Sequence, residues 1–355
     1  MKRLILFVLS VIHLVCSALA QSDDRSAAIS GLFKGYDINN MAGVSVMVIK
    51  DSQIIYNRSF GFADAAHKVP ATPHTNYRLA SLSKPFTAMA VMILRDERKL
   101  SLDDPLHKFF PKIRIYGNQI TIRHMLTHTA GLPNYGDLIP PGTTKPLTDW
   151  DVLHLVEQQD TAAFKPGQRF EYSNTAYSLL SLIVEKVSGM PYDEFIKQRI
   201  FKPLGMTNST LNVMGDSIRN RAYGYDKKGD SLVMSDQSLY SYVLGDGGVY
   251  SSVSDLFKWD QALYTSKLVK SETIDEMFTI KSWENDHTAY GYGWYIDEKY
   301  GQKRVSHSGG TSGFSTYMIR YPTLKFSIII LSNLDEGFTV GEVANRIENI
   351  YLKGH

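Results

Sequence analysis

Two patterns of apolar residues divide the chain. The first is a run of β-branched and apolar residues interrupted by the turn signal Asp51, Ser52 and Gln53, which predicts a hairpin near the start. Three segments near the end of the chain share this strand character. The predicted strands are residues 43–50, 54–62, 290–297, 313–321 and 326–332. We expect these five strands to form one antiparallel sheet.

Helical periodicity fills the region between the two blocks of strands. The predicted helices are residues 82–95, 121–127, 149–158, 175–187 and 192–200. Residues before Ile38 and after Val340 also have a helical pattern, and helices at both ends would cover the sheet. The predicted fold class is therefore α/β, of the α+β kind, with an antiparallel five-stranded sheet flanked by N- and C-terminal helices and an inserted all-helical lobe.

The length and composition predict one large domain. A chain of 355 residues with 43% hydrophobic content can bury a substantial core. We expect a single domain over residues 21–355, with a sheet lobe from 21–80 and 245–355 and a helical lobe from 81–244.

The first twenty residues have the layout of a secretory signal peptide. Lys2 and Arg3 precede an apolar run, and Ala18-Leu19-Ala20 would place the cleavage before Gln21. No later apolar stretch approaches the ~20 residues that cross a bilayer. We therefore expect residues 1–20 to be removed, and the mature chain to be periplasmic or secreted without a membrane span.

Cys16 is the only cysteine of the chain and lies within this signal. A lipoprotein would use it as the lipidated residue, but Val15 precedes it where a small residue is expected. If Cys16 leaves with the signal, the mature chain has no disulfide, and thiolate catalysis is excluded.

The charge balance argues against two classes of partner. The chain has 38 Lys and Arg residues against 36 Asp and Glu residues, and the loss of Lys2 and Arg3 makes these numbers equal. A mature chain with zero net charge has no electrostatic reason to bind nucleic acid or an anionic membrane. The oligomeric state is not fixed by the sequence.

The helix predicted over residues 82–95 is apolar on nearly every side, which is typical of a helix buried at the centre of a molecule. Proline is tolerated only in the first turn of a helix, so Pro85 places Ser81 at or near the N-terminus, with Lys84 one turn along. A lysine three residues after a serine lies on the same face and can take the hydroxyl proton. Ser81 is therefore the candidate nucleophile and Lys84 its base.

The Ser-x-x-Lys spacing is a weak signal by itself, because about one such pair is expected by chance in a chain of this length. A capping serine followed by a solvated lysine is the alternative. To act as a base near neutral pH, Lys84 needs its pKa lowered from ~10.4 by about three units. A lysine within so apolar a helix is costly unless it has a function.

Two further segments place polar groups at element boundaries. Tyr172-Ser173-Asn174 brings a phenol and an amide to a helix entrance, where a packed tyrosine and a capping residue are the alternative. His307 is followed by Gly309 and Gly310, which let backbone N–H groups approach a ligand, although a glycine-rich turn with an incidental histidine is also possible.

In this order the three motifs resemble the serine β-lactamase and penicillin-binding-protein superfamily, specifically its class C β-lactamase-like branch of esterases and D-amino-acid peptidases. The resemblance spans nearly all of the predicted mature chain. Segments 121–132, 245–252 and 290–294 are also similar to segments of that family.

The resemblance implies a β-lactamase/transpeptidase-like fold and a role for each matching residue. Ser81 matches the acylated nucleophile and Lys84 its proton acceptor. Tyr172 matches the tyrosine that shares proton transfer and protonates the leaving group. Asn174 matches the amide that orients the substrate and the lysine.

His307 matches the lysine of the family's Lys-Thr-Gly motif, and the N–H groups of Ser81 and Gly310 match an oxyanion hole. A histidine at this position replaces a permanent positive charge by a group that we expect to titrate near neutrality. The resemblance therefore implies an exported hydrolase of esters or D-amino-acid peptides. A true β-lactamase, or a sensor that binds penicillin or peptide without turnover, is the alternative.

We expect no metal and no cofactor. His124 and His128 are four residues apart on a predicted helix, which is a spacing of metal ligands, but no adjacent glutamate accompanies them as in His-Glu-x-x-His.

Overall fold

The computed structural model describes residues 24–34, 41–113, 117–229, 231–336 and 338–353. Within these residues the main feature is an eight-stranded sheet in which every neighbouring pair of strands is antiparallel. In spatial order its strands are β10 (Ser282–Trp283), β11 (Ala289–Tyr290), β12 (Tyr295–Lys299), β13 (Gln302–Thr311), β14 (Phe314–Tyr321), β15 (Phe326–Ser332), β1 (Val44–Lys50) and β2 (Gln53–Phe60). The predicted signal peptide lies outside the described residues.

The structure confirms the predicted N-terminal hairpin. The predicted number of five strands was wrong, because the sheet has eight. The expected strand 290–297 is divided into β11 and β12 by a turn at Gly293, which has a φ of +81°. Strand β13 was not among the five predicted strands, although residues 304–310 were expected to place His307 on a strand edge, because its polar and glycine residues lack the apolar pattern of the other strands. It is nevertheless the longest strand of the sheet and the one that carries His307.

Helices and smaller strands occupy the rest of the chain. The helices are residues 24–31, η1 (Ala80–Ser83), α2 (Lys84–Asp96), α3 (Leu106–Phe109), α4 (Ile122–Leu126), η2 (Tyr135–Leu138), α5 (Asp149–Glu157), α6 (Asn174–Ser188), α7 (Tyr192–Ile196), η3 (Lys197–Phe201), α8 (Lys202–Leu204), α9 (Leu244–Gly247), α10 (Val253–Ala262), α11 (Ser271–Met277) and α12 (Val340–Leu352). The smaller strands are β3 (Phe62–Asp64), β4 (Val69–Pro70), β5 (Tyr77–Arg78), β6 (Thr210–Leu211), β7 (Tyr225–Lys228), β8 (Ser231–Met234) and β9 (Val249–Ser251).

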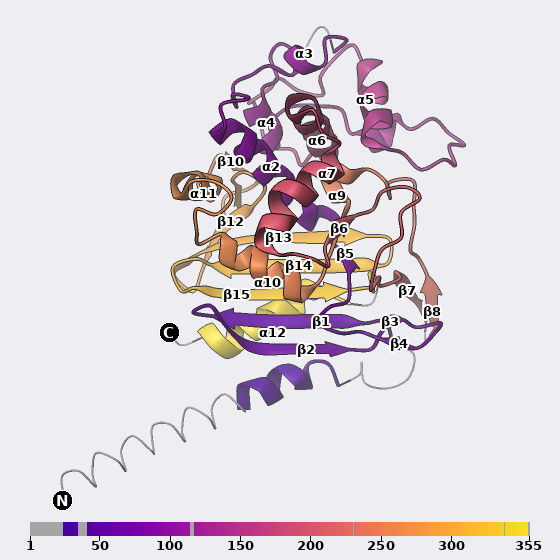
Figure 1. Ribbon diagram of the computed structural model, residues 1–355, viewed down its shortest axis with the longest axis vertical. Helices are drawn as coiled ribbons and strands as arrows, with labels where there is room; N and C mark the ends of the chain where they lie inside the picture. The colour runs from indigo at the N-terminus through magenta and orange to yellow at the C-terminus, as the bar shows by residue number, and fades with distance from the viewer. Residues whose placement is uncertain (1–23, 35–40, 114–116, 230, 337, 354–355) are drawn as a thin grey trace, which may run out of the picture.

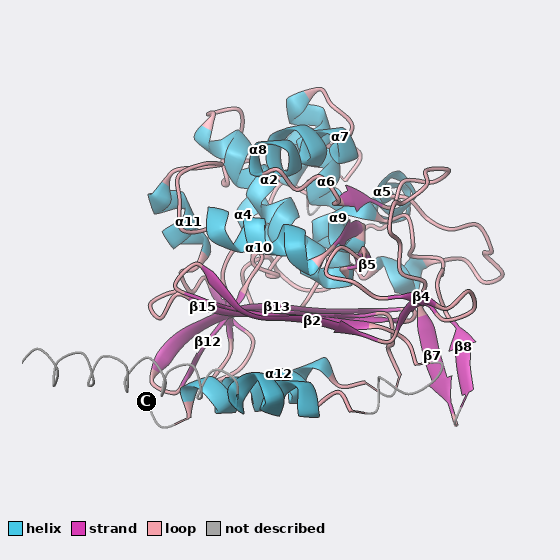
Figure 2. Cartoon of the chain, turned by 60° about the horizontal axis from the view of Figure 1, so that its bottom comes forward, coloured by secondary structure: helices cyan, strands magenta, loops and turns pink. Residues whose placement is uncertain are grey.

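Figure 2 shows three layers, with most helices on one face of the sheet and α12 on the other. Ile29 and Phe33 belong to the same apolar cluster as Ile347 of α12, so both terminal helices pack on one face of the sheet. Helices α10 and α11 follow residue 245 but lie on the face that carries the other helices (Figure 2). Among the described residues, none of the helices has the length and apolar character needed to span a bilayer.

Helix α2 lies at the centre of the larger core, between the sheet and the other helices (Figure 1). Every residue of α2 from Lys84 to Leu94 is buried, as its apolar pattern predicts. Pro85 occupies its first turn, and the preceding residues form the short 3-10 turn η1. Ser81 therefore lies just before a buried helix, at the level where the helices meet the sheet.

Candidate active site

The η1 turn that carries Ser81 is held from several sides. Ala80 adopts a left-handed φ of +50°, which is unfavourable for a residue with a Cβ. Strand β13 passes so close that a Cβ on Gly309 would overlap the carbonyl oxygen of Leu79. The Thr316 hydroxyl donates to that same carbonyl over 2.8 Å. These contacts with the sheet hold the strained turn in place.

Lys84 is fully buried, and its Nζ atom has three hydrogen-bond partners. Nζ lies 3.0 Å from Ser81 Oγ, 2.8 Å from Asn174 Oδ1 and 2.9 Å from the carbonyl oxygen of Asp246. Burial lowers the pKa of Lys84 to about 8, and the negative charge of Asp246 opposes this shift. At pH 7 about a tenth of the molecules therefore carry a neutral amine at this position.

The three partners also determine where the lone pair of that amine points. Asn174 Oδ1 and the Asp246 carbonyl oxygen can only accept hydrogen bonds, so they take both hydrogens of a neutral amine. The lone pair is then left for the third partner, the Ser81 hydroxyl. Protonated Lys84 instead donates to Ser81 Oγ, so the arrangement accommodates the amine before and after proton transfer.

Tyr172 approaches the same serine from the loop before α6. Its hydroxyl interacts with the Ser81 side chain, and Lys84 Nζ lies 4.8 Å from the centroid of its ring. Burial raises the pKa of Tyr172 well above its usual value. The phenol therefore keeps its proton at neutral pH, and Lys84 is the group able to accept one.

His307 does not titrate near neutrality, contrary to the expectation from the sequence. Its Nδ1 lies 2.7 Å from the Ser308 carbonyl oxygen, which can only accept, so Nδ1 carries the hydrogen and Nε2 accepts from the Tyr290 hydroxyl over 3.0 Å. Burial, followed by the charge of Lys84, lowers its pKa to about 3. The imidazole is therefore neutral and supplies no positive charge to a substrate.

The sequence indicated no role for Asp246, which belongs to segment 245–252, one of the segments similar to the β-lactamase family. Its backbone accepts from Lys84, and its carboxylate accepts from the Tyr135 hydroxyl over 3.0 Å. The short helix α9 that carries it is fixed by the buried carboxylate of Asp149, which accepts from the N–H groups of Leu244 and Gly245. The glycine next to Asp246, Gly245, was the sequence feature that could have pointed to this helix. In the structure a Cβ on Gly245 would overlap the Tyr177 carbonyl oxygen, so the close packing there requires glycine.

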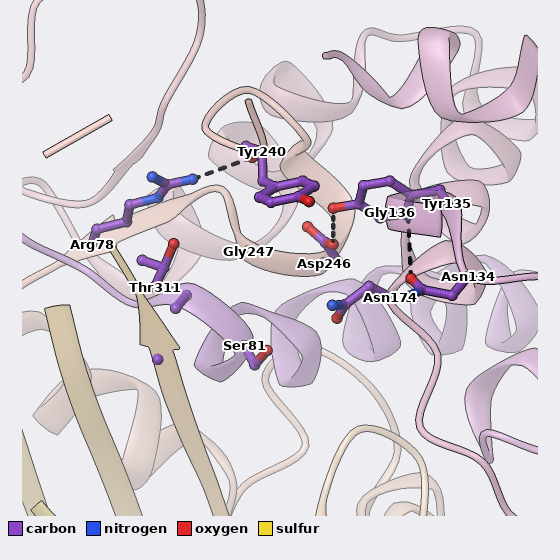
Figure 3. Close-up of a pocket in the computed structure, with 12 residues that line it drawn as sticks. Arg78, Ser81, Asn134, Tyr135, Gly136, Asn174, Tyr240, Asp246, Gly247 and Thr311 are labelled. Carbon is purple, nitrogen blue, oxygen red and sulfur yellow. Dashed lines mark hydrogen bonds between the residues drawn. The ribbon is translucent and has the colours of Figure 1, made fainter. Parts of the chain in front are cut away.

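Ser81 opens into a cavity of about 240 Å³ (Figure 3). Of the other residues proposed from the sequence, Asn174 and Gly310 line it as well, whereas Lys84 and His307 are buried behind the surface. A Cβ on Gly310 would meet nothing within 4 Å, so its backbone is open to the cavity. The remaining lining residues are Arg78, Ala80, Asn134, Tyr135, Gly136, Tyr240, Asp246, Gly247 and Thr311.

Two loops form what we call the outer wall of the cavity, made of residues 134–136 and Tyr240. The rings of Tyr135 and Tyr240 meet edge to face with centroids 5.8 Å apart. Beyond the cavity the same loops are joined where Leu147 N donates to the Leu239 carbonyl over 2.8 Å. The outer wall thus rests on these two loops, the first of which includes the 3-10 turn η2, whereas Ser81, Lys84 and Asn174 rest on η1 and two buried helices.

His124 and His128 are not arranged as metal ligands. The Thr121 N–H donates to His124 Nδ1 in a capping box, and the Ser173 N–H donates to His128 Nδ1. Among the described residues, no group of three or more His, Cys, Asp or Glu side chains is placed to hold a metal ion.

A serine hydroxyl that faces the lone pair of a buried lysine, with a phenol beside the same oxygen, is the arrangement of a serine hydrolase. The chain matches the family described as Beta-lactamase over residues 29–352. It therefore belongs to the β-lactamase family of serine hydrolases, which includes penicillin-binding proteins, as its motifs indicate.

Individual relatives agree with this assignment. The chain is 36% identical over 316 residues to penicillin-binding protein 4* of Bacillus subtilis, which covers 82% of this chain and 68% of that protein. An octameric penicillin-binding protein homologue from Pyrococcus abyssi has a TM-score of 0.76 at 32% identity, with 97% of this chain and 77% of that one covered. A D-amino acid amidase from Ochrobactrum anthropi has a TM-score of 0.81 over 94% of this chain and 100% of that one, but its 23% identity shows a shared fold alone.

Proposed function

We propose that Ser81 is the nucleophile of this hydrolase and that the neutral amine of Lys84 is its base. The observation that carries the proposal is the set of three partners around Nζ, which directs the lone pair of the amine at Ser81 Oγ. The pKa of Lys84, lowered to about 8 by burial, gives a usable fraction of that amine near neutral pH.

The reaction begins when Ser81 Oγ attacks the substrate carbonyl and its proton passes to Lys84. The N–H groups of Ser81 and Gly310 receive the developing oxyanion, and each donor of this kind contributes about 3 kcal/mol of transition-state stabilisation. Tyr172 donates its proton to the leaving group and regains one from Lys84. A water molecule then gives a proton to the same pair and attacks the acyl carbonyl, and that proton returns to Ser81 Oγ as the bond to the acyl group breaks.

Labelling with a fluorescent phosphonate tests the nucleophile. Wild-type protein is expected to bind one equivalent covalently, while the Ser81→Ala variant is expected to bind none and to hydrolyse no p-nitrophenyl ester. Lys84→Arg serves as a matched control, because it keeps a positive charge but cannot supply a neutral amine. Undiminished labelling of Ser81→Ala would refute the assignment.

We further propose that the substrate is an ester or a D-amino-acid-containing peptide or amide rather than a β-lactam. Neutral His307 offers no charge to the carboxylate that penicillins carry, and the Arg78 guanidinium already donates to Ser241 and to the Tyr240 carbonyl oxygen. The cavity is lined by amides, phenols and charged groups of both signs, including Arg78 and Asp246, which favours a polar, peptide-like acyl group over a long apolar one.

A substrate panel distinguishes these classes. It compares short-chain p-nitrophenyl esters, D-alanyl-D-alanine peptides, amides of D-amino acids and the chromogenic cephalosporin nitrocefin. Esters or D-peptides are expected to exceed nitrocefin in kcat/KM, and the fastest turnover for nitrocefin would identify a true β-lactamase. A burst of one equivalent without a steady state would instead identify a binding sensor.

Export is the remaining part of the proposal, supported by Lys2, Arg3, the apolar run after them and the small residues at 18–20. Mass spectrometry of protein recovered from the natural host should find Gln21 as the first residue. A chain that begins at Cys16 with a lipid-sized mass increment would show a lipoprotein, and an intact Met1 would contradict cleavage.

A further inference from the structure

His128 is a buried residue to which the proposed reaction gives no task. It is completely buried and has a left-handed φ of +56°, a conformation that is uncommon for a residue with a Cβ. Such strain persists only where the surroundings enforce it, and it is often found at functional sites. The contacts of His128 are therefore informative about what the strained conformation achieves.

His128 accepts hydrogen bonds from the residues on both sides of Tyr172. The His128 carbonyl oxygen accepts from the Glu171 N–H over 2.8 Å, and its ring atom Nδ1 accepts from the Ser173 N–H over 3.0 Å. The imidazole also lies against the tyrosine ring, with centroids 4.3 Å apart. The residue before Tyr172, its own ring and the residue after it are thus all held by one side chain and its backbone.

The segment held by His128 leads directly into the rest of the site. Ser173 caps helix α6 by accepting from the Ala176 N–H over 3.1 Å. Asn174, the first residue of that helix, accepts from Lys84 Nζ. A shift of Ser173 would therefore displace Tyr172 on one side and Asn174 on the other.

The bond to Ser173 requires a neutral imidazole, because a protonated ring has no lone pair at Nδ1. Burial, followed by the charge of Lys84, lowers the pKa of His128 well below its usual value and keeps it neutral. The hydrogen then resides on Nε2, which has no hydrogen-bond partner among the described residues. His128 contacts Tyr172 but has no bond to Ser81, so it can act on the reaction only through its neighbours.

We propose that His128 is a positioning residue that sets the Tyr172 hydroxyl against Ser81 and Asn174 against Lys84. This inference rests on the roles proposed above for Tyr172 and Asn174. The acceptor at Nδ1 is the feature that matters most, since it holds the Ser173 N–H. The left-handed backbone is what brings both acceptors of His128 to the same segment.

Two variants separate the acceptor from the ring. His128→Asn keeps an acceptor at the same number of bonds from the backbone and tolerates a positive φ. His128→Phe keeps an aromatic ring beside Tyr172 but leaves the Ser173 N–H without a partner. Both should be compared with wild type after titration of active sites with the phosphonate, with circular dichroism to check folding.

The measured quantity is kcat/KM for a p-nitrophenyl ester and for an alkyl ester of the same acid. p-Nitrophenolate leaves without a proton, whereas an alkoxide needs one from Tyr172. We expect His128→Phe to lose about tenfold more on the alkyl ester than on the aryl ester, as leaving a buried donor unpaired implies. His128→Asn should keep the wild-type ratio of the two substrates, even if both rates decline.

A loss in His128→Phe that is equal for the two esters would show a merely structural role and overturn the proposal. If that variant does not fold, the ratio in His128→Asn decides, and a ratio shifted toward the aryl ester contradicts the inference. Labelling that persists in Ser81→Ala would refute the proposed function itself, so the two failures are distinguishable.

Discussion

The Asn174→Asp variant changes one acceptor of the Lys84 amine into a charged one of the same shape. Asn174 Oδ1 lies 2.8 Å from Lys84 Nζ, and the substitution adds no atoms that could crowd the site. A carboxylate at this distance favours the ammonium form of Lys84 and raises its pKa. The variant therefore tests whether the neutral amine is the reactive form.

The size of the effect follows from the distance. Two unit charges 2.8 Å apart attract by about 6 kcal/mol at an effective dielectric constant of about 20. Desolvation of the new carboxylate offsets part of this energy, and we take about half, or about two pKa units, as the net effect. The pKa of Lys84, about 8 in the wild type, should then rise to about 10, and the neutral fraction at pH 7 should fall about a hundredfold.

The assay is kcat/KM for a short-chain p-nitrophenyl ester as a function of pH. Wild type should lose activity below about pH 8, where Lys84 becomes protonated, whereas Asn174→Asp should lose it below about pH 10 and approach the wild-type rate only above that. Asn174→Leu removes the acceptor without adding charge, so its rate should fall at every pH without an upward shift. An unshifted profile in Asn174→Asp would refute the assignment of Lys84 as the base.

Three further predictions concern stability. Burial lowers the pKa of Lys84 from 10.5 to about 8, so the unfolded chain binds the proton more tightly than the folded chain. The Lys84→Met variant should therefore be more stable than wild type by about 3 kcal/mol at pH 7, and this difference should vanish as the pH rises from 8 to 10.5. Denaturant titrations that give the same difference at every pH would contradict this. In Gly309→Ala the new Cβ overlaps the Leu79 carbonyl oxygen, which should lower the Tm and reduce the free energy of unfolding by about 1–3 kcal/mol. The control Gly310→Ala should leave the Tm unchanged, because its Cβ meets nothing within 4 Å. Similar Tm values for the two variants would show that the η1 turn adjusts freely. Burial raises the pKa of Asp149 from 3.8 to about 7, so between these pH values the folded chain holds a proton that the unfolded chain releases. The free energy of unfolding of wild type should therefore fall from pH 4 to 7 by up to about 4 kcal/mol more than that of Asp149→Asn. The same dependence of unfolding free energy on pH in both proteins would contradict the shift.

The sequence predicted the elements with strong periodicity and the residues with strong local constraints. Strand β15 and the burial of α2 follow from continuous apolar runs, and the position of Ser81 before a helix follows from Pro85. These features depend on a few neighbouring residues, which is why a single sequence suffices for them.

Features that depend on tertiary contacts escaped prediction. Strand β13 lacks an apolar pattern because glycine is needed where it meets the η1 turn. The ionisation of His307 was wrongly expected near neutrality, since its burial and its bond to Tyr290 come from β11, a separate strand. The Asp246 carbonyl is a backbone acceptor, and no side-chain motif could have indicated its bond to Lys84.

The separation of the outer wall from the residues around Lys84 bears on how substrate range can change during evolution. Asn134, Gly136 and Tyr240 reach the cavity without a hydrogen bond, among the described residues, to the partners of Lys84, whereas the Tyr135 hydroxyl donates to Asp246. Substitutions at the first three residues can therefore sample new specificities while the acylation chemistry is retained. The contact between Tyr135 and Tyr240 makes the two loops interdependent, however. Libraries that vary both loops together should therefore yield more active variants than libraries that vary either loop alone.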